Sequence, residues 1–248
     1  MRRGFVNLNG QRTLVNIDNN GNVTHNGQTI TNPEWLPISI GTVYGVALNY
    51  KGLLDSRLAE FNEPPYKNPP IKPVLFIKTP STYNNHLGNI VFPKGIERIQ
   101  AGPALGFVMA KDASRVTKEQ AMDYVAGFTV VNEVSLPEDS YYRPAVKAKC
   151  RDSFCPMGPW LVATDAVNAA NLAISVSING EVRQQNSTAN LVRNIPQLIE
   201  ELSEFMTLKA GDIILTGTPE GRVDINVGDK VEVTIEGIAT LTNTVIAE

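Results

Sequence analysis

The chain has 248 residues, of which 42% are hydrophobic and 19% charged, and its formal net charge is −3. This composition is typical of a globular protein with one large domain, or a main domain with a small appendage. The slight acidity argues against nucleic-acid and anionic-membrane partners, which need a basic face. No stretch reaches the roughly 18 apolar residues of a membrane span. The first residues lack the apolar core of a signal peptide, so a cytoplasmic protein with reduced cysteines is expected.

Short apolar runs separated by Asn–Gly pairs mark the first 38 residues. The pairs Asn20-Gly21 and Asn26-Gly27 stand between such runs, which is the strongest local signal for β-hairpins. A unit of this size cannot bury a core alone. We therefore predict a small N-terminal β domain over residues 1–38, packed on a main domain over residues 39–248.

Apolar runs in the remainder predict further strands, joined by few helices. The strands are expected at 42–48, 74–78, 90–92, 99–110, 127–131, 172–178, 181–185, 212–215, 231–235 and 239–245. Helices are expected at 53–61, at 116–124 with a capping box of Thr117 and Gln120, and from Pro196 to near Gly211. Many strands and few short helices predict a mainly β (α+β) fold.

The stretch from Asn132 to Trp160 concentrates acids, bases and hydroxyls between a predicted core strand and a proline-rich turn. Polar groups held between rigid elements are where sites usually form. A charged surface loop is the alternative. The two cysteines of this stretch, Cys150 and Cys155, do not have zinc-ligand spacing. Because neither His25 nor His86 accompanies a G-x-S-x-G elbow, a Ser-His-Asp hydrolase is not expected.

Four segments together resemble the fumarylacetoacetate hydrolase family. They are Gly211-Asp-Ile-Ile-Leu-Thr-Gly-Thr-Pro-Glu-Gly221, Asn179-Gly-Glu-Val-Arg-Gln-Gln, Leu202-Ser-Glu-Phe-Met-Thr-Leu and Lys149-x-x-Asp152-x-x-x-Pro156-x-Gly-Pro. The resemblance covers residues 40 to 248 and implies a mixed β-roll with a small N-terminal β domain. Within the family, residues 138–156 are similar to the isomerase/decarboxylase branch of 4-hydroxyphenylacetate (homoprotocatechuate) breakdown, and to its N-terminal repeat.

By this resemblance the substrate is a small 2-oxo dicarboxylic or tricarboxylic acid, and the cofactor is Mg²⁺ or Mn²⁺, which holds the charge that develops on oxygen. The implied reactions are isomerisation of 2-hydroxyhepta-2,4-diene-1,7-dioate and decarboxylation of 5-oxopent-3-ene-1,2,5-tricarboxylate. The resemblance also implies a dimer or larger homo-oligomer.

The chain departs from the family pattern at the positions that would hold the metal. Gly102 and Ala104 stand where the family has a Glu-x-Glu pair, and Gln100 stands in place of a histidine. Only Glu133 keeps a carboxylate at a ligand position, so a bound metal is doubtful. The family's acid/base His and Glu fall at Leu53 and Ser56, which carry no proton near neutral pH.

The retained residues leave two functions open. In the first the chain is an enzyme, or a component of one, in which Lys149 acts as electrophile and Glu133 as proton carrier. Substrate-binding residues would then be Asp152, Ser153, Gly217, Thr218 and Gln184. In the second the chain is a non-catalytic, metal-free subunit that pairs with a metal-binding paralogue. A metal-dependent acylpyruvate hydrolase or oxaloacetate decarboxylase is less favoured, because that chemistry needs the missing ligands.

Overall fold

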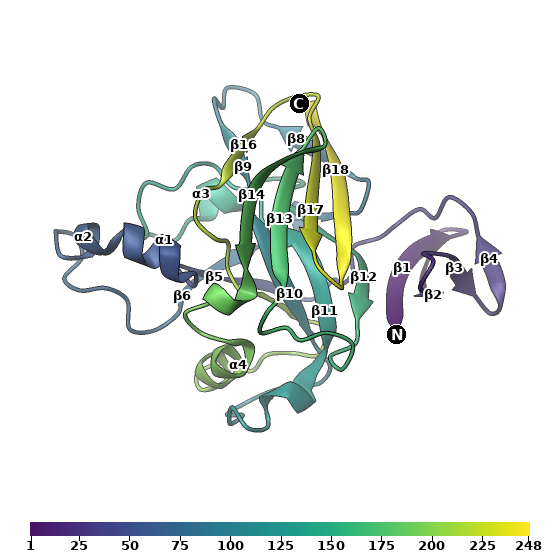
Figure 1. Ribbon diagram of the computed structural model, residues 1–248, viewed down its shortest axis with the longest axis horizontal. Helices are drawn as coiled ribbons and strands as arrows, with labels where there is room; N and C mark the ends of the chain where they lie inside the picture. Colours follow the sequence, from purple (N-terminus) through teal and green to yellow (C-terminus); the bar gives the residue numbers. More distant parts are fainter.

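The computed structural model describes residues 1–248 as two β-sheets packed face to face, with a two-stranded ribbon and short helices around them (Figure 1). This confirms the mainly β fold. The larger sheet has eleven strands, in the order β4 (Gln28–Ile30), β3 (Val23–His25), β2 (Gln11–Ile17), β1 (Arg2–Leu8), β12 (Cys155–Val162), β11 (Val125–Asn132), β10 (Pro103–Met109), β15 (Ile213–Leu215), β5 (Val43–Ala47) and β6 (Val74–Lys78), with β7 (Tyr83–Asn85) paired to β12.

The smaller sheet has five strands, in the order β14 (Glu181–Ser187), β13 (Ala173–Ile178), β17 (Lys230–Ile235), β18 (Ala239–Ala247) and β8 (Asn89–Phe92). The ribbon consists of β16 (Val223–Ile225) and β9 (Ile99–Ala101). The α-helices are α1 (Lys51–Ser56), α2 (Leu58–Phe61), α3 (Val146–Lys149) and α4 (Ile195–Ser203), and the 3₁₀ turns are η1 (Pro80–Thr82), η2 (Ala121–Tyr124) and η3 (Thr188–Asn190). No helix is long and apolar enough to cross a membrane.

Strand β10 shows how the core is divided. It is buried along its whole length, because it lies inside the larger sheet with apolar groups on both faces. Leu105 and Phe107 point into the main core between the two sheets, whereas Ala104 and Val108 belong to a second apolar cluster on the opposite face. This division follows the period of two that a strand imposes on its side chains.

The N-terminal residues fold into hairpins around Asn20-Gly21 and Asn26-Gly27, as predicted. A further hairpin, which was not predicted, turns at Asn9-Gly10, where both residues have positive φ. They enclose a small apolar cluster of their own that includes Trp35. Strand β1 also pairs antiparallel with β12, with Gly4 opposite Trp160, so the hairpins extend the larger sheet. In Figure 1 they stand at one side of the molecule, opposite α1 and α2. A separate domain over residues 1–38 remains a prediction.

The helix predicted at 116–124 is wrong in extent. Only the 3₁₀ turn η2 forms, without a side-chain cap, so Thr117 and Gln120 make no capping box. The chain enters β11 at Val125, directly after η2, so the turn does not continue as a helix. Helix α4, by contrast, begins with a capping box formed by Asn194 and Gln197. It ends at Ser203, before the predicted end near 209–211, because Leu208 exchanges two backbone hydrogen bonds with Ala113.

Candidate functional site

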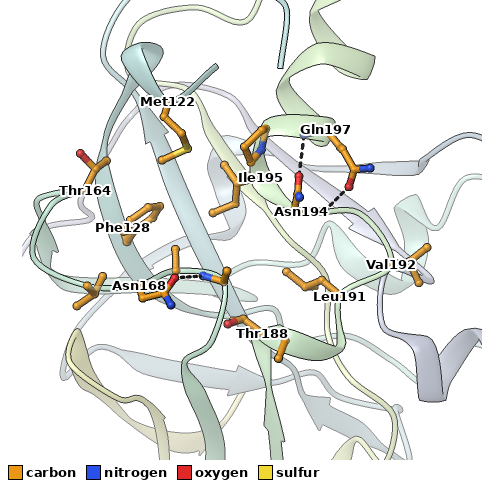
Figure 2. A pocket seen from close by; sticks show the side chains of 15 residues that line it. Met122, Phe128, Thr164, Asn168, Thr188, Leu191, Val192, Asn194, Ile195 and Gln197 are labelled. Carbon is orange, nitrogen blue, oxygen red and sulfur yellow. Dashed lines mark hydrogen bonds between the residues drawn. The ribbon is translucent and has the colours of Figure 1, made fainter. Parts of the chain in front are cut away.

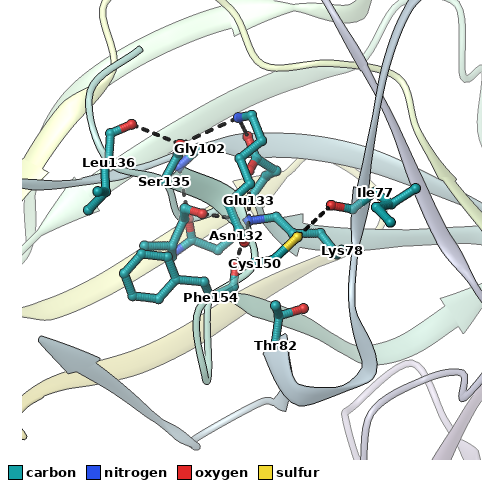
Figure 3. A network of polar contacts seen from close by, with 12 residues as sticks. Ile77, Lys78, Thr82, Gly102, Asn132, Glu133, Ser135, Leu136, Cys150 and Phe154 are labelled. Atoms are coloured by element: carbon teal, nitrogen blue, oxygen red, sulfur yellow. Dashed lines mark hydrogen bonds and ion pairs between the residues drawn. The ribbon is translucent and has the colours of Figure 1, made fainter. Parts of the chain in front are cut away.

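The buried carboxylate of Glu133 lies at the centre of a charged cluster at the end of β11. Its backbone is fixed across the larger sheet, because Glu133 N–H donates to the carbonyl of Gly102 at 2.6 Å. The side chain of Asn132 accepts the Gly102 N–H at 2.9 Å (Figure 3). Only 1% of Glu133 is exposed. A carboxylate this deeply buried needs cationic partners.

Three cations surround Glu133, each from a different part of the chain. Lys78 Nζ, at the end of β6, lies 2.8 Å from Oε1, and Lys149 Nζ, at the end of α3, lies 2.9 Å from Oε2. Arg222, directly after the 216–221 turn, pairs with the same Oε2 and also donates from Nη1 to the Glu133 carbonyl at 3.0 Å. Glu133 is therefore held from three sides.

Lys78 also joins β6 to the segment that carries the site. Its ammonium donates to the carbonyl oxygens of Val134 at 2.6 Å, Lys149 at 2.8 Å and Phe154 at 3.1 Å. These three bonds use the three donors of a lysine. Lys78 is consequently a fully satisfied structural cation.

Lys149 is shared between two carboxylates. Besides Glu133, its ammonium lies 2.8 Å from Glu138 Oε2, and the Glu138 side chain is only 10% exposed. The ring of Phe76 lies under the ammonium, 4.4 Å away. With Lys78 and Arg222 included, three cations face two carboxylates. The cluster carries one net positive charge, which favours an anionic ligand.

Burial and charge shift the proton affinities in the cluster. Burial alone would raise the pKa of Glu133, but Lys149, Lys78 and Arg222 outweigh it and hold that pKa well below its usual range. Burial lowers the pKa of Lys149, against the attraction of Glu133 and Glu138. Burial and the nearby Glu138 raise the pKa of Tyr141 to about 12. Glu133 thus stays ionised near neutral pH, which is unfavourable for the proton-carrier role expected from the sequence.

A small cavity of about 20 Å³ adjoins this cluster. Its wall combines the charged groups with apolar side chains and consists of Val46, Ala47, Leu48, Leu53, Phe76, Glu133, Glu138, Tyr141, Thr218 and Arg222. A wider hollow of about 190 Å³ shares Ala47, Phe76, Glu138 and Tyr141 with it and extends to Arg143. Arg222 lines only the smaller cavity, and Arg143 lines only the wider hollow.

The residues present do not fit a divalent metal ion. A Cβ at Gly102 would overlap the Glu133 carbonyl oxygen and lie 2.7 Å from Arg222 Nη1, so no carboxylate can stand there. Ala104 points into the apolar cluster behind the sheet. Both carboxylates in the cavity wall are already ion-paired, and no group of three or more His, Cys, Asp or Glu residues gathers anywhere in the chain. A hard cation needs several free oxygen ligands.

The structure brings some of the predicted site residues to the cavity. Glu133 and Thr218 line it, and Lys149 lies directly behind Glu138. Gly217 has a φ of 110° and its backbone lies against the Val46 carbonyl, which only glycine tolerates. Gln184 Nε2 donates to the Glu220 carbonyl at 2.6 Å and thereby supports the turn that ends at Arg222.

Of the five predicted substrate-binding residues only Thr218 lines the cavity; Asp152, Ser153, Gly217 and Gln184 lie outside its wall. Asp152 is exposed. The hydroxyl of Ser153 accepts the Val91 N–H at 2.8 Å and so braces β8. Of the two positions of the missing acid/base pair, Leu53 of α1 lines the cavity, whereas Ser56 is exposed and bonds back to the Leu53 carbonyl.

Sequence analysis missed four members of the site: Lys78, Glu138, Tyr141 and Arg222. Lys78 is the one charged residue of an otherwise apolar strand, which is a detectable signal. Arg222 directly follows the polar turn identified in the sequence. Neither position reveals its contact with Glu133, because the partners are 55 and 89 residues apart in the chain.

A larger cavity of about 520 Å³ lies elsewhere, between the start of α4 and the segment around Asn168 (Figure 2). Its wall contains apolar, hydroxyl and amide side chains, among them Phe128, Thr188 and Asn194, and no titratable group. It offers no proton carrier or fixed charge. The candidate site is therefore the smaller charged cavity.

Comparison with known proteins agrees with this fold. Residues 42–246 match the fumarylacetoacetate (FAA) hydrolase C-terminal family, and the chain belongs to that family. It is 45% identical over 208 residues to the 4-hydroxyphenylacetate degradation bifunctional isomerase/decarboxylase of Salmonella dublin, covering 84% of this chain and 48% of that protein. The homoprotocatechuate catabolism bifunctional isomerase/decarboxylase of Escherichia coli is 44% identical with the same coverage. The chain thus spans about half the length of these relatives.

Solved structures extend the similarity to the whole chain. The 5-carboxymethyl-2-hydroxymuconate delta-isomerase of Mycobacterium smegmatis superposes with a TM-score of 0.83 at 29% identity, covering 100% of this chain and 99% of that one. The 2-hydroxyhepta-2,4-diene-1,7-dioate isomerase of Mycobacterium marinum does so with a TM-score of 0.84 at 28% identity and the same coverage. The N-terminal hairpins are therefore included in the structural match.

Proposed function

We propose that the chain is an isomerase/decarboxylase component that acts on unsaturated 2-hydroxy or 2-oxo di- and tricarboxylic acids in 4-hydroxyphenylacetate breakdown. One observation carries this proposal: a cavity beside a cluster of three cations and two carboxylates, whose wall holds Glu138 in contact with Lys149. The names of the relatives, which include an isomerase of 2-hydroxyhepta-2,4-diene-1,7-dioate, support the same substrate class.

Both reactions pass through an enol or enolate. In the isomerisation a proton leaves the enol hydroxyl, the electron pair shifts along the diene, and a proton is added to a distant carbon. In the decarboxylation the bond to one carboxylate breaks, carbon dioxide leaves, and the oxo group accepts the electron pair until the carbon is protonated. A fixed cation near that oxygen lowers the barrier of either reaction.

The proton is exchanged at the Glu138–Lys149 pair. Burial lowers the pKa of Lys149, which makes loss of its proton easier than in water. Glu138 reaches both the inner cavity and the wider hollow, so it can pass a proton between Lys149 and a bound acid. Glu133 acts as the anchor of the surrounding cations. Arg143, which lines the wider hollow, would bind a second carboxylate.

A non-catalytic role beside a metal-binding paralogue is the second candidate. The inner cavity of about 20 Å³ favours it, since this volume holds little more than a water molecule. For turnover, Leu53 of α1 would have to move away from the cavity that it lines.

The experiment compares turnover by the wild-type chain with turnover by the Lys149→Met and Lys147→Met variants. Isomerisation of the dienedioate is followed by ultraviolet absorbance, and decarboxylation of the tricarboxylate is followed by carbon dioxide release. Lys147 is exposed on the same helix and serves as the control. Wild type and Lys147→Met should be active alone, whereas Lys149→Met should lose about 10²- to 10⁴-fold in kcat. If the chain is inactive alone and the K149M change has no effect in a mixture with the paralogue, the non-catalytic role is correct instead.

A further inference from the structure

We propose that Arg222 is the carboxylate-binding residue of this site and that it replaces the divalent metal, so that the site binds its 2-oxo acid without a metal ion. This inference rests on the proposed function for the class of ligand. It goes beyond the proposed function by naming Arg222 as the group that binds the acid and by stating that no metal ion is needed.

The guanidinium of Arg222 is fixed on one side and free on the other. It donates from Nη1 to the Glu133 carbonyl and from Nη2 to the Glu133 carboxylate. An arginine has five N–H donors, so three remain for another partner. The side chain is 16% exposed and forms part of the cavity wall next to Thr218 and Tyr141. A planar fork held in this way matches the two oxygens of a carboxylate.

The absence of a side chain at Gly102 gives Arg222 its place. A Cβ there would lie 2.7 Å from Arg222 Nη1, which is closer than real Cβ contacts. The space that a ligating side chain at position 102 would enter is therefore occupied by a guanidinium. The glycine at position 102 and the arginine at position 222 therefore depend on each other sterically.

The charge balance agrees with an anion rather than a cation as ligand. Glu133 is paired with Lys78, Lys149 and Arg222, and Glu138 is paired with Lys149. A metal ion would have to displace these cations or bind beside them, and both are unfavourable. A carboxylate, in contrast, neutralises the excess positive charge.

The turn that precedes Arg222 is also held by hydrogen bonds from the smaller sheet. Gln184 donates to the Glu220 carbonyl, and Asn186 Nδ2 donates to Glu220 Oε1 at 3.1 Å. Both come from β14 of the smaller sheet. The guanidinium itself is therefore held in place before a ligand binds, which favours affinity, and the room for a carboxylate comes from movement of Leu53 out of the cavity.

The test is calorimetric titration with 2-oxoadipate, a 2-oxo dicarboxylate, in EDTA and in millimolar Mn²⁺, together with titration of MnCl₂ alone. Wild type should bind 2-oxoadipate equally in both buffers and should not bind Mn²⁺. The R222A change should weaken the binding of 2-oxoadipate by about 10- to 100-fold, because a charge-assisted pair is lost. Arg222→Lys should weaken it by less, because the charge is kept. Arg183→Ala, at an exposed arginine paired with Glu181, is the control and should bind like wild type.

Mn²⁺-dependent binding of 2-oxoadipate, unchanged binding by R222A, or no binding by wild type in either buffer would each overturn the inference. A thermal melt of each variant identifies loss of folding, and Arg222→Lys keeps the charge next to Glu133 if R222A unfolds. Because the titration measures equilibrium binding, normal binding without turnover would refute the proposed catalytic function and leave the role of Arg222 standing.

Discussion

Replacing Lys78 with methionine tests how the site is held together. The ammonium of Lys78 bonds three carbonyl oxygens and pairs with Glu133 in a region that is about 1% exposed. Methionine fills a similar volume but leaves those carbonyls without a donor. Breaking one partner of a buried charge pair costs about 3–5 kcal/mol. Since Lys149 and Arg222 still neutralise Glu133, we expect the lower half of that range, about 3 kcal/mol, as the loss in free energy of unfolding.

Urea denaturation followed by tryptophan fluorescence measures this loss. Trp35 and Trp160 lie 6.2 Å apart between their ring centroids, where the N-terminal hairpins meet the main sheet, and report on unfolding. Lys72→Met is the control, since Lys72 is 67% exposed and its pair with Glu204 is solvated, so a change below about 0.5 kcal/mol is expected. A loss below about 1 kcal/mol for Lys78→Met would show that water or a rearranged lysine replaces its contacts, and that Lys78 does not brace the site.

Three further predictions concern single positions. Gly102→Ala should lower the free energy of unfolding by about 1–3 kcal/mol in urea, and by more than Gly106→Ala, whose new methyl group meets only side chains; equal effects would contradict the crowding at Gly102. Burial lowers the pKa of His86 to about 4, and its Nδ1 accepts the Thr242 N–H. Between about pH 6.5 and 4, His86 is protonated in the unfolded chain but not in the folded chain. The free energy of unfolding should therefore fall with falling pH by about 1–2 kcal/mol, after allowance for the partial exposure of His86. His86→Asn should remove this dependence of stability on pH in thermal melts at several pH values. An unchanged dependence would show that other groups cause it. Asn194→Ala should cost about 1 kcal/mol in urea by removing the capping box of α4, whereas the exposed Asn22→Ala on a hairpin turn should cost less.

Most strands were predicted, because their signals are local. Strand β12 was not predicted, and the single strand expected at 99–110 is divided at Gly102 into β9 of the ribbon and β10 of the larger sheet. The alternation in residues 172–178 and the Asn179-Gly180 turn identify β13 and β14 without reference to the rest of the chain. The helix predicted at 116–124 was wrong in extent for the opposite reason. Its helical signal was local, but the outcome depended on where β11 had to begin.

The site was predicted only in part. Glu133 and Lys149 belong to the polar stretch, and the structure confirms that the two side chains are in contact. Lys78 and Arg222 come from β6 and from the turn before β16, which only the folded sheet brings to the same carboxylate. Their role depends on charge pairing between distant segments, and no periodicity in one sequence records such pairing. The sequence showed that Gly102 and Ala104 carry no acid, whereas the cation that lies next to Gly102 could not be seen in it.

The pairing of β12 has a consequence for the stretch of chain that matches the family. One edge of β12 is covered by two short strands in succession: β7 pairs with Cys155 to Met157, and β1 pairs with Trp160 to Val162. Residues 1–38 lie outside the family match at 42–246, yet they contain β1, the second of these two strands. A chain trimmed to the matched region would expose that part of β12 as an open strand edge next to Trp160. Such edges recruit strands from other molecules. The hairpins therefore protect the sheet against self-association.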